Sequence, residues 1–314
     1  MMGVKVVFMG TPDFAVPTLE ALVAQGWDVL VVTQPDKKVG RKHVITPPPV
    51  KVAARKHGLR VLQPTKVREE ASVLELQAFQ PDLIVTAAYG QLLPASVLSI
   101  PRVGAVNVHA SLLPRWRGAA PIHRAIMAGD TETGVTIMEM VQALDAGPML
   151  ERRAIPILNT DNVGSLHDKL AQLGAQMCQQ VLPRYVDGAL TATEQPEQGV
   201  TYAARIERAD EFIDWTGSVT TVDQHIRGLS PWPGATAWDG EATYKIWSAH
   251  KVPIEARLEP GEVRRVGSDI LVGCLDGILC LDEVQPSGRR KMAARDWFGG
   301  IRQDAFSFVK GSPS

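Results

Sequence analysis

The sequence has few cysteines, and those present do not form a recognisable site. Cys178, Cys274 and Cys280 lack the spacing of a metal centre, and three thiols cannot all pair in disulfides. No apolar run reaches the roughly 18–20 residues that span a bilayer. The N-terminus indicates a strand and a turn, without the small-residue cleavage site of a secretory signal. We therefore expect a cytoplasmic protein with reduced thiols, no metal and no membrane contact.

Two nucleotide-binding signatures are also missing. The turn after the first expected strand is Gly10-Thr11-Pro12, which has one glycine where a dinucleotide fingerprint needs three. No Gly-x4-Gly-Lys phosphate loop occurs. The net charge of −1 does not by itself indicate a nucleic-acid partner. These absences argue against nicotinamide chemistry and against phosphoryl transfer of the P-loop type.

What is present in the first 200 residues is an alternation of apolar strands and amphipathic helices. Continuous β-branched runs between helices are typical of a parallel sheet covered on both faces, so we predict a Rossmann-like α/β domain with a mostly parallel sheet. Pro183 is expected to bend or end the last helix early. The expected strands are Lys5–Met9, Asp28–Thr33, Pro81–Ala88, Gly104–His109 and Thr133–Met140, and the expected helices are 17–25, 49–57 and 165–186.

The composition changes beyond residue 190. A polar stretch at 191–201 resembles a linker. Two Asp-Gly pairs, at Asp239-Gly240 and Asp276-Gly277, lie between short β-rich runs and predict hairpins. Several short strands at this spacing predict a small antiparallel, OB-like β-barrel. We expect a catalytic domain over 1–190, a linker over 191–206 and a C-terminal domain over 207–314.

Positive charge is concentrated in one part of the chain. Between residues 37 and 60 there are eight lysines and arginines and no acidic residue. A solvated helix face explains the charges from Lys51 to Arg60. For the earlier group, solvent exposure and contact with a polyanion are equally good explanations. That group consists of Lys37, Lys38, Arg41 and Lys42.

The most informative run is AVNVHASLLPRWRGAAPI at residues 105–122. Side chains alternate along a strand, so Asn107 and His109 project to the same side. An asparagine amide can donate to a developing oxyanion, and a histidine can move a proton near neutral pH. A loop with one proline and one glycine follows at 111–118, at the strand end where open α/β sheets bind ligands. This arrangement is typical of acyl or formyl transfer, although either polar residue alone is more often a satisfied core or turn residue.

A histidine that acts as an acid or base needs a partner, and Asp145 in Leu144-Asp145-Ala146-Gly147 is the candidate. It follows the expected strand Thr133–Met140. Because loops at the carboxyl ends of parallel strands meet at one rim, we expect Asp145 to approach His109 there. The alternative is that Asp145 caps a turn.

Together, the Asn-x-His pair, SLLPRWRGAAPI and LDAG resemble the folate-dependent formyltransferase family. FMGTPDFAVPTLEAL near the N-terminus, TPPPVKVAA and SPWPGA narrow the resemblance to members that formylate methionyl-initiator tRNA. The resemblance extends over nearly the whole chain. It implies a formyl donor, 10-formyltetrahydrofolate, whose formyl group is transferred to the α-amino group of the tRNA-bound methionine.

The resemblance also implies residue roles. Asn107 and His109 would stabilise the tetrahedral oxyanion, and Asp145 would hold the imidazole. Folate would contact three segments: Tyr89, Gly90, Gln91 and Leu92; Ser111, Leu112, Leu113 and Pro114; and the loop Val141–Asp145. The tRNA would contact Lys37, Lys38, Arg41 and Lys42. The C-terminal barrel would bind tRNA, and we expect a monomer without a metal.

The net charge of the C-terminal domain gives little independent support to tRNA binding. From residue 207 to the C-terminus there are 13 Lys and Arg against 16 Asp and Glu, a net charge of −3. Three alternatives stay open. Two are enzymes that share the site but differ in the acceptor, namely a formyltransferase acting on a nucleotide-sugar amine and the hydrolase half of a formyl-folate dehydrogenase. The third is a non-catalytic RNA-binding protein.

Overall fold

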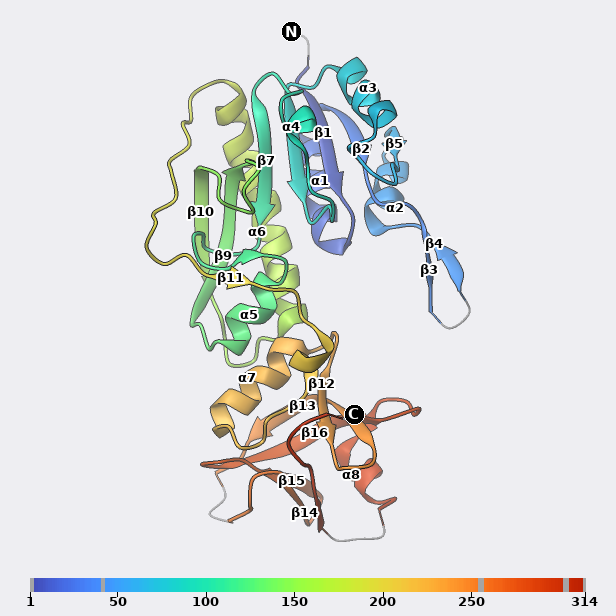
Figure 1. Cartoon of the computed structure of the whole chain (residues 1–314), viewed down its shortest axis with the longest axis vertical. Helices are drawn as coiled ribbons and strands as arrows, with labels where there is room; N and C mark the ends of the chain where they lie inside the picture. The colour runs from blue at the N-terminus through green and yellow to red at the C-terminus, as the bar shows by residue number, and fades with distance from the viewer. Residues whose placement is uncertain (1–2, 41–42, 254–256, 302–304, 313–314) are drawn as a thin grey trace. The chain divides into compact units, whose positions relative to one another are not determined.

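The computed structural model describes residues 3–40, 43–253, 257–301 and 305–312, which form two compact units (Figure 1). The first unit comprises Met1–Gly118, Glu132–Ile155 and His167–Ala203, and the second comprises Ala119–Thr131, Pro156–Leu166 and Ala204–Ser314. Neither unit is continuous in sequence. Among the described residues, no helix combines the length and apolarity needed to cross a bilayer.

The first unit is built on a seven-stranded sheet in the order β10-β9-β7-β6-β1-β2-β5. The pairs β1–β2, β1–β6, β2–β5 and β6–β7 are parallel, which confirms the mostly parallel sheet. The pair β7–β9 is antiparallel, a direction that the sequence did not predict. The strands are β1 (Lys5–Gly10), β2 (Asp28–Val32), β5 (Val61–Leu62), β6 (Leu83–Ala87), β7 (Gly104–His109), β9 (Glu132–Glu139) and β10 (Met149–Pro156).

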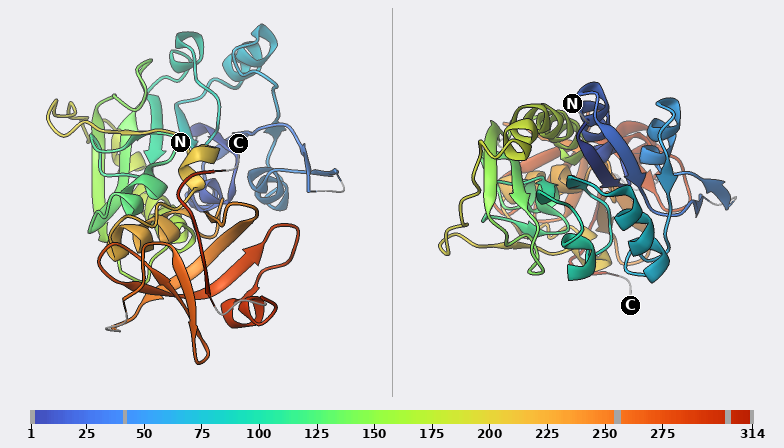
Figure 2. Two further views of the ribbon diagram at one scale, coloured as in Figure 1. Left: turned by 60° about the horizontal axis from the view of Figure 1, so that its bottom comes forward. Right: turned by 90° about the horizontal axis from the view of Figure 1, so that it is seen from above.

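Helices cover both faces of this sheet (Figure 2). On one face, Leu76 of α3 and Val97 of α4 share a buried cluster with Val7 and Met9 of β1. On the other face, α6 approaches β7 so closely that a Cβ at Gly174 would lie 2.7 Å from Val108. The helices are η1 (Asp13–Ala15), α1 (Val16–Ala24), α2 (Pro49–Lys56), α3 (Glu70–Phe79), α4 (Ala95–Leu98) and α6 (Val163–Val186).

Of the two effects expected of Pro183, an early end of α6 is wrong, because Pro183 lies in the last turn and the helix continues to Val186. In the basic segment after β2, β3 (Lys37–Val39) and β4 (Val44–Thr46) pair as an antiparallel hairpin, which projects from the sheet in Figure 1. The short β8 (Arg117–Gly118) and β11 (Tyr202–Ala203) form a further parallel pair.

The second unit contains an antiparallel sheet in the order β12-β13-β16-β15-β14-β18, with β17 on β16. Both Asp-Gly hairpins are confirmed. The amide of Val309, just beyond β18, donates to Trp238 at the other edge of the sheet, so the sheet curls towards itself. The strands are β12 (Ala235–Trp238), β13 (Thr243–Lys251), β14 (Glu262–Val266), β15 (Asp269–Gly273), β16 (Ile278–Pro286), β17 (Met292–Ala293) and β18 (Ala305–Ser307).

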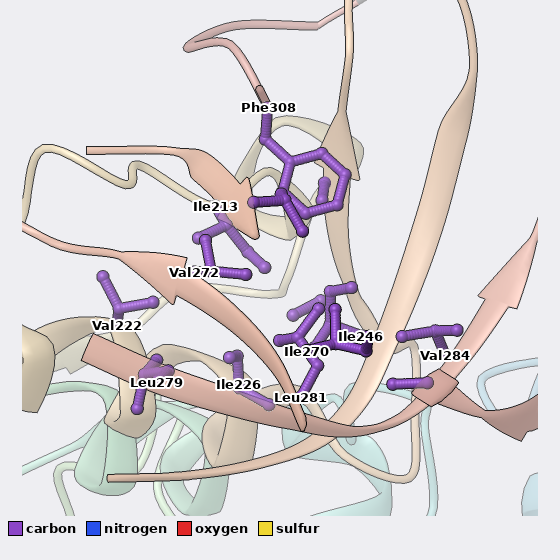
Figure 3. Close-up of a cluster of buried hydrophobic side chains, with 14 of the residues drawn as sticks. Ile213, Val222, Ile226, Ile246, Ile270, Val272, Leu279, Leu281, Val284 and Phe308 are labelled. Carbon is purple, nitrogen blue, oxygen red and sulfur yellow. The ribbon is translucent and has the colours of Figure 1, made fainter. Parts of the chain in front are cut away.

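Helices and aromatic side chains complete the core of the second unit. Val222 and Ile226 of α7 point towards the aliphatic side chains of the sheet (Figure 3). Phe308 stacks on Trp215 with ring centroids 5.5 Å apart. The helices are α5 (Pro121–Met127), η2 (Arg208–Glu211), α7 (Val219–Leu229) and α8 (Ala294–Phe298).

Candidate active site

Asn107 lies on β7 directly beside Thr86 of β6. The Thr86 hydroxyl donates a hydrogen bond of 2.7 Å to Oδ1 of Asn107. This bond orients the carboxamide with Oδ1 towards Thr86, so the Nδ2 hydrogens point away from the Thr86 hydroxyl. Asn107 is therefore held as a hydrogen-bond donor, which is the role expected of an oxyanion-stabilising group.

His109 is buried at the carboxyl end of β7, with 5% of its surface exposed. Its Nε2 lies 2.9 Å from the carbonyl oxygen of Trp116. A carbonyl oxygen can only accept, so Nε2 carries a proton in both the neutral and the charged imidazole. Nδ1 is therefore the nitrogen that gains and loses a proton.

Trp116 supplies that carbonyl from a constrained backbone position. Its φ is +65°, in the left-handed region that L-residues seldom adopt. Its amide donates to the Thr201 hydroxyl at 2.9 Å, and the Arg115 guanidinium lies 4.3 Å from the centre of its ring. These contacts explain why a bulky residue stands in a loop beside the strand end.

Asp145 meets His109 as predicted. Its Oδ2 lies 3.7 Å from Nδ1 of His109, and the same oxygen accepts a hydrogen bond of 2.8 Å from the amide of Gly118. The distance to Nδ1 exceeds a hydrogen bond, but contacts between catalytic groups often shorten when substrate binds. Asn107, His109 and Asp145 thus converge on one side of β7.

The route by which Asp145 arrives differs from the prediction. The strand β9 runs antiparallel to β7. Its last residue, Glu139, pairs with Val106, which precedes the carboxyl end of β7. A Cβ on Gly147 would overlap the carbonyl oxygen of Glu139, so the loop 140–147 leaves and returns at the end of β9. Asp145 reaches His109 as part of this excursion, not from a shared rim of parallel strands.

The first predicted folate segment is partly used by the fold itself. The Tyr89 side chain is buried in the cluster around β1, and burial raises the pKa of its phenol to about 12. The Gln91 side chain accepts from the amide of Val67 and donates to the carbonyl of Pro64. Gly90 has a φ of +86°, and Leu92 is 83% exposed. Leu92 and the backbone around Gly90 are therefore the parts most accessible to a ligand.

The second predicted folate segment is also largely structural. The Ser111 hydroxyl donates to the carbonyl of Arg115 at 2.6 Å. Leu113 and Pro114 are buried, whereas Leu112 is partly exposed. These contacts shape the loop after β7, and folate binding by this segment stays a prediction.

Of the predicted tRNA contacts, Lys37 and Lys38 are exposed on β3, whereas Arg41 and Lys42 lie outside the described residues. Lys51 is not a solvated side chain as expected: it is buried, with its Nζ 2.7 Å from Asp36. A hydrogen bond from Gln63, followed by the Lys51 contact, lowers the pKa of Asp36. Asp36 directly precedes β3, so these contacts anchor the base of the hairpin.

The sequence prediction missed residues that hold the three candidate side chains. Thr86 is a polar residue in an otherwise apolar strand, which is a signal that could have identified it. The Trp116 carbonyl and the Gly118 amide act through the backbone and leave no such signal.

One cluster with metal-ligating chemistry occurs among the described residues. Donor atoms of His250, Cys280 and Asp282 lie within 4.8 Å of one another in the second unit. Cys280 packs against Leu271 and Ile278, and His250 pairs with Asp282. The cluster therefore resembles a core thiol beside a surface ion pair.

Comparison with known proteins gives matches over most of the chain. Residues 4–182 match the formyl transferase family, and residues 205–302 match its C-terminal domain. Methionyl-tRNA formyltransferase of Bacillus licheniformis is 51% identical over 300 residues, which cover 94% of this chain and 95% of that protein. Methionyl-tRNA formyltransferase of a Geobacillus species is 49% identical, with 95% and 94% covered.

Among solved structures, an N-formyltransferase from Helicobacter canadensis in complex with folinic acid and dTDP-3-aminofucose has a similar fold. Its TM-score is 0.69 at 16% identity, with 92% of this chain and all of that chain covered. The two sequence matches and the relatives of about 50% identity lead to one conclusion: the chain belongs to the formyl transferase family.

Proposed function

We propose that this enzyme transfers the formyl group of 10-formyltetrahydrofolate to the α-amino group of methionyl-initiator tRNA. The observation that carries the chemistry is the convergence of Asn107, His109 and Asp145 on one side of β7. Support for the acceptor comes from the relatives of about 50% identity named methionyl-tRNA formyltransferase.

The reaction begins when the methionine amine attacks the formyl carbon. A C–N bond forms, and the carbonyl oxygen becomes an oxyanion that accepts a hydrogen bond from Nδ2 of Asn107. A protonated His109 adds positive charge nearby, stabilised by the Asp145 carboxylate. The bond from carbon to N10 of the folate then breaks, N10 gains a proton and the amine loses one. No net proton is released.

His109 and Asp145 are suited to this proton transfer. Only Nδ1 of the imidazole can exchange a proton, because Nε2 is committed to the Trp116 carbonyl. Nδ1 faces the Asp145 carboxylate, with Oδ2 at 3.7 Å. A proton can pass between amine and N10 through this pair and a water molecule. The substrate supplies the nucleophile, so the mechanism needs no nucleophilic side chain.

The tRNA is expected to contact the β3–β4 hairpin. Lys37 and Lys38 are exposed there and attract phosphate without reading sequence. Three apolar side chains of the hairpin are also exposed by 54–66%, namely Val39, Val44 and Ile45. Exposed apolar groups beside lysines suit a surface that packs against nucleotides.

An assay with two acceptors tests the proposal. Purified enzyme is given 10-formyltetrahydrofolate with either methionyl-initiator tRNA or a nucleotide-linked amino sugar. We expect formyl-methionyl-tRNA from the wild type, little product from the sugar, and a loss of activity in His109→Ala. Formylation of the sugar but not of the tRNA would contradict the proposed acceptor. Binding of tRNA without any product would contradict an enzymatic role.

A further inference from the structure

Gln195 lies at the centre of a hydrogen-bonded network behind Asp145. Its Nε2 donates to the carbonyl oxygens of Asp145 and Gly147, both at 2.8 Å. Its Oε1 accepts from Arg117 twice, from Nε at 3.0 Å and from a terminal nitrogen at 2.7 Å. We call this set of four hydrogen bonds the Gln195 clamp.

The chemistry of the clamp requires a carboxamide. The Arg117 guanidinium can only donate, and the two carbonyls can only accept. A bridge between them needs an acceptor at one end and two N–H groups at the other, which glutamine supplies. A glutamate at this position would turn a carboxylate oxygen towards two carbonyl oxygens and repel them.

The clamp holds the backbone of the residue whose carboxylate faces His109. Asp145 has a φ of +46°, a conformation that needs support from its surroundings. Its carbonyl is held by Gln195 and its carboxylate by the amide of Gly118. Arg117 and Gly118 are therefore tied to opposite ends of the same residue.

The strand β11, which pairs with β8, fixes the clamp in place. Arg117 and Gly118 pair with Tyr202 and Ala203 in a parallel ladder. At Gly118, whose φ is +118°, a Cβ would lie only 2.8 Å from the carbonyl oxygen of Ala203. The stretch that precedes β11, expected from sequence to be a linker, therefore contributes to the support of Asp145.

We propose that Gln195 and Arg117 are positioning residues, which hold the Asp145 carboxylate against Nδ1 of His109. This inference rests on the proposed function. It predicts that the clamp affects the chemical step through Asp145 and leaves substrate binding largely intact.

The test compares Gln195→Ala and Gln195→Glu with the wild type, and with Gln198→Ala as a control on an exposed glutamine of the same stretch. Misplacing a catalytic group by about 1 Å can cost about 100-fold in rate, so we expect kcat to fall about 10- to 100-fold in Gln195→Ala. The loss should be at least as large in Gln195→Glu. KM for both substrates should change less than about threefold, and Gln198→Ala should match the wild type.

A double variant shows whether the effect passes through Asp145. In an Asp145→Asn background, Gln195→Ala should cause little further loss, because groups that act as a unit are not additive. Full additivity, or a loss confined to KM, would overturn the inference.

Hydrogen exchange of the loop 140–148 provides a readout that needs no substrate. Its amides should exchange faster in Gln195→Ala than in the wild type or Gln198→Ala. Wild-type activity that persists unchanged in Gln195→Ala would overturn the clamp and leave the proposed function standing. An inactive wild type with the expected exchange pattern would overturn the proposed function alone.

Discussion

At the scale of single residues, the direction of one carboxamide determines what the site can stabilise. The hydroxyl of Thr86 donates to Oδ1 of Asn107, and this orients the carboxamide so that its N–H groups are available to a substrate. A group held in this way loses little free energy to reorientation when negative charge develops.

Replacing Asn107 tests this role. Asn107→Ala should lower kcat about 10²- to 10³-fold, because removing one oxyanion donor costs about 2.7–4 kcal/mol. Asn107→Asp keeps the size but cannot donate when ionised, so it should be equally slow. Thr86→Val, which removes only the orienting hydroxyl, serves as the milder comparison. Steady-state formylation rates provide the measurement, and an active Asn107→Asp enzyme would contradict an oxyanion role.

The same scale shows what the sequence could and could not reveal. Asn107 and His109 were predictable because two polar side chains share one face of an apolar strand. Gln195 was not, because it lies 50 residues from Asp145 in the chain and acts on a carbonyl oxygen. Contacts to backbone atoms place no constraint on residue type at the partner position, so sequence alone does not show them.

At the scale of elements, the site depends on where each strand starts and in which direction it runs. The strands β1, β2, β6 and β7 were predicted within two residues, because continuous apolar runs define them. The direction of β9 was not predicted. Its side chains are buried on both faces of the sheet, and this pattern would be the same for a parallel and for an antiparallel strand. The helix α3 was missed because only Leu76 is buried among its ten residues, which leaves little periodicity.

Asp82 joins two of these strands and gives the fold a dependence on pH. It accepts from the amide of Lys5 at 2.9 Å and from Arg102 at 2.8 Å. The Lys5 hydrogen bond and then Arg102 lower the pKa of its carboxyl. A lowered folded-state pKa means that the contribution is complete above the unfolded value of about 3.9 and is lost as pH falls through the folded value.

Asp82→Asn should therefore destabilise the protein by about 1 kcal/mol at pH 7, an estimate for a partly exposed charged hydrogen bond. The difference from the wild type should shrink as pH falls below about 4 and through the lowered folded-state pKa of the Asp82 carboxyl. Urea unfolding at several pH values measures both quantities. A difference that stays constant down to pH 3 would contradict the assignment.

At the scale of the whole molecule, two units have separate cores although the chain passes between them more than once. The core of the second unit combines aliphatic side chains with aromatic packing, in which the Phe308 ring lies against Trp215 and 6.3 Å from Trp297. The Asp-Gly hairpins of this unit were predictable from local turn chemistry. The discontinuous boundaries were not, because they depend on packing between distant segments. Helix α7 was missed although Ser218 caps it and Val222, Ile226 and Leu229 follow at helical spacing.

Phe308→Ala tests the core of the second unit. Removing a buried phenylalanine side chain lowers the free energy of unfolding by about 3–5 kcal/mol. The second unit should therefore unfold at a markedly lower denaturant concentration. Leu275→Ala is the matched control, because Leu275 is 68% exposed and its loss should cost less than about 0.5 kcal/mol. Equal effects of the two substitutions would contradict the described core.

The most direct test of the central claim is single-turnover formyl transfer to methionyl-initiator tRNA by the wild type and by Asp145→Asn. Asparagine can still accept the hydrogen bond from Gly118, but it cannot take up a proton from the imidazole or supply a negative charge beside it. We expect product from the wild type and a rate about 10²- to 10⁴-fold lower in Asp145→Asn, with tRNA affinity retained. A variant as fast as the wild type, or a wild type that forms no formyl-methionyl-tRNA, would contradict the central claim.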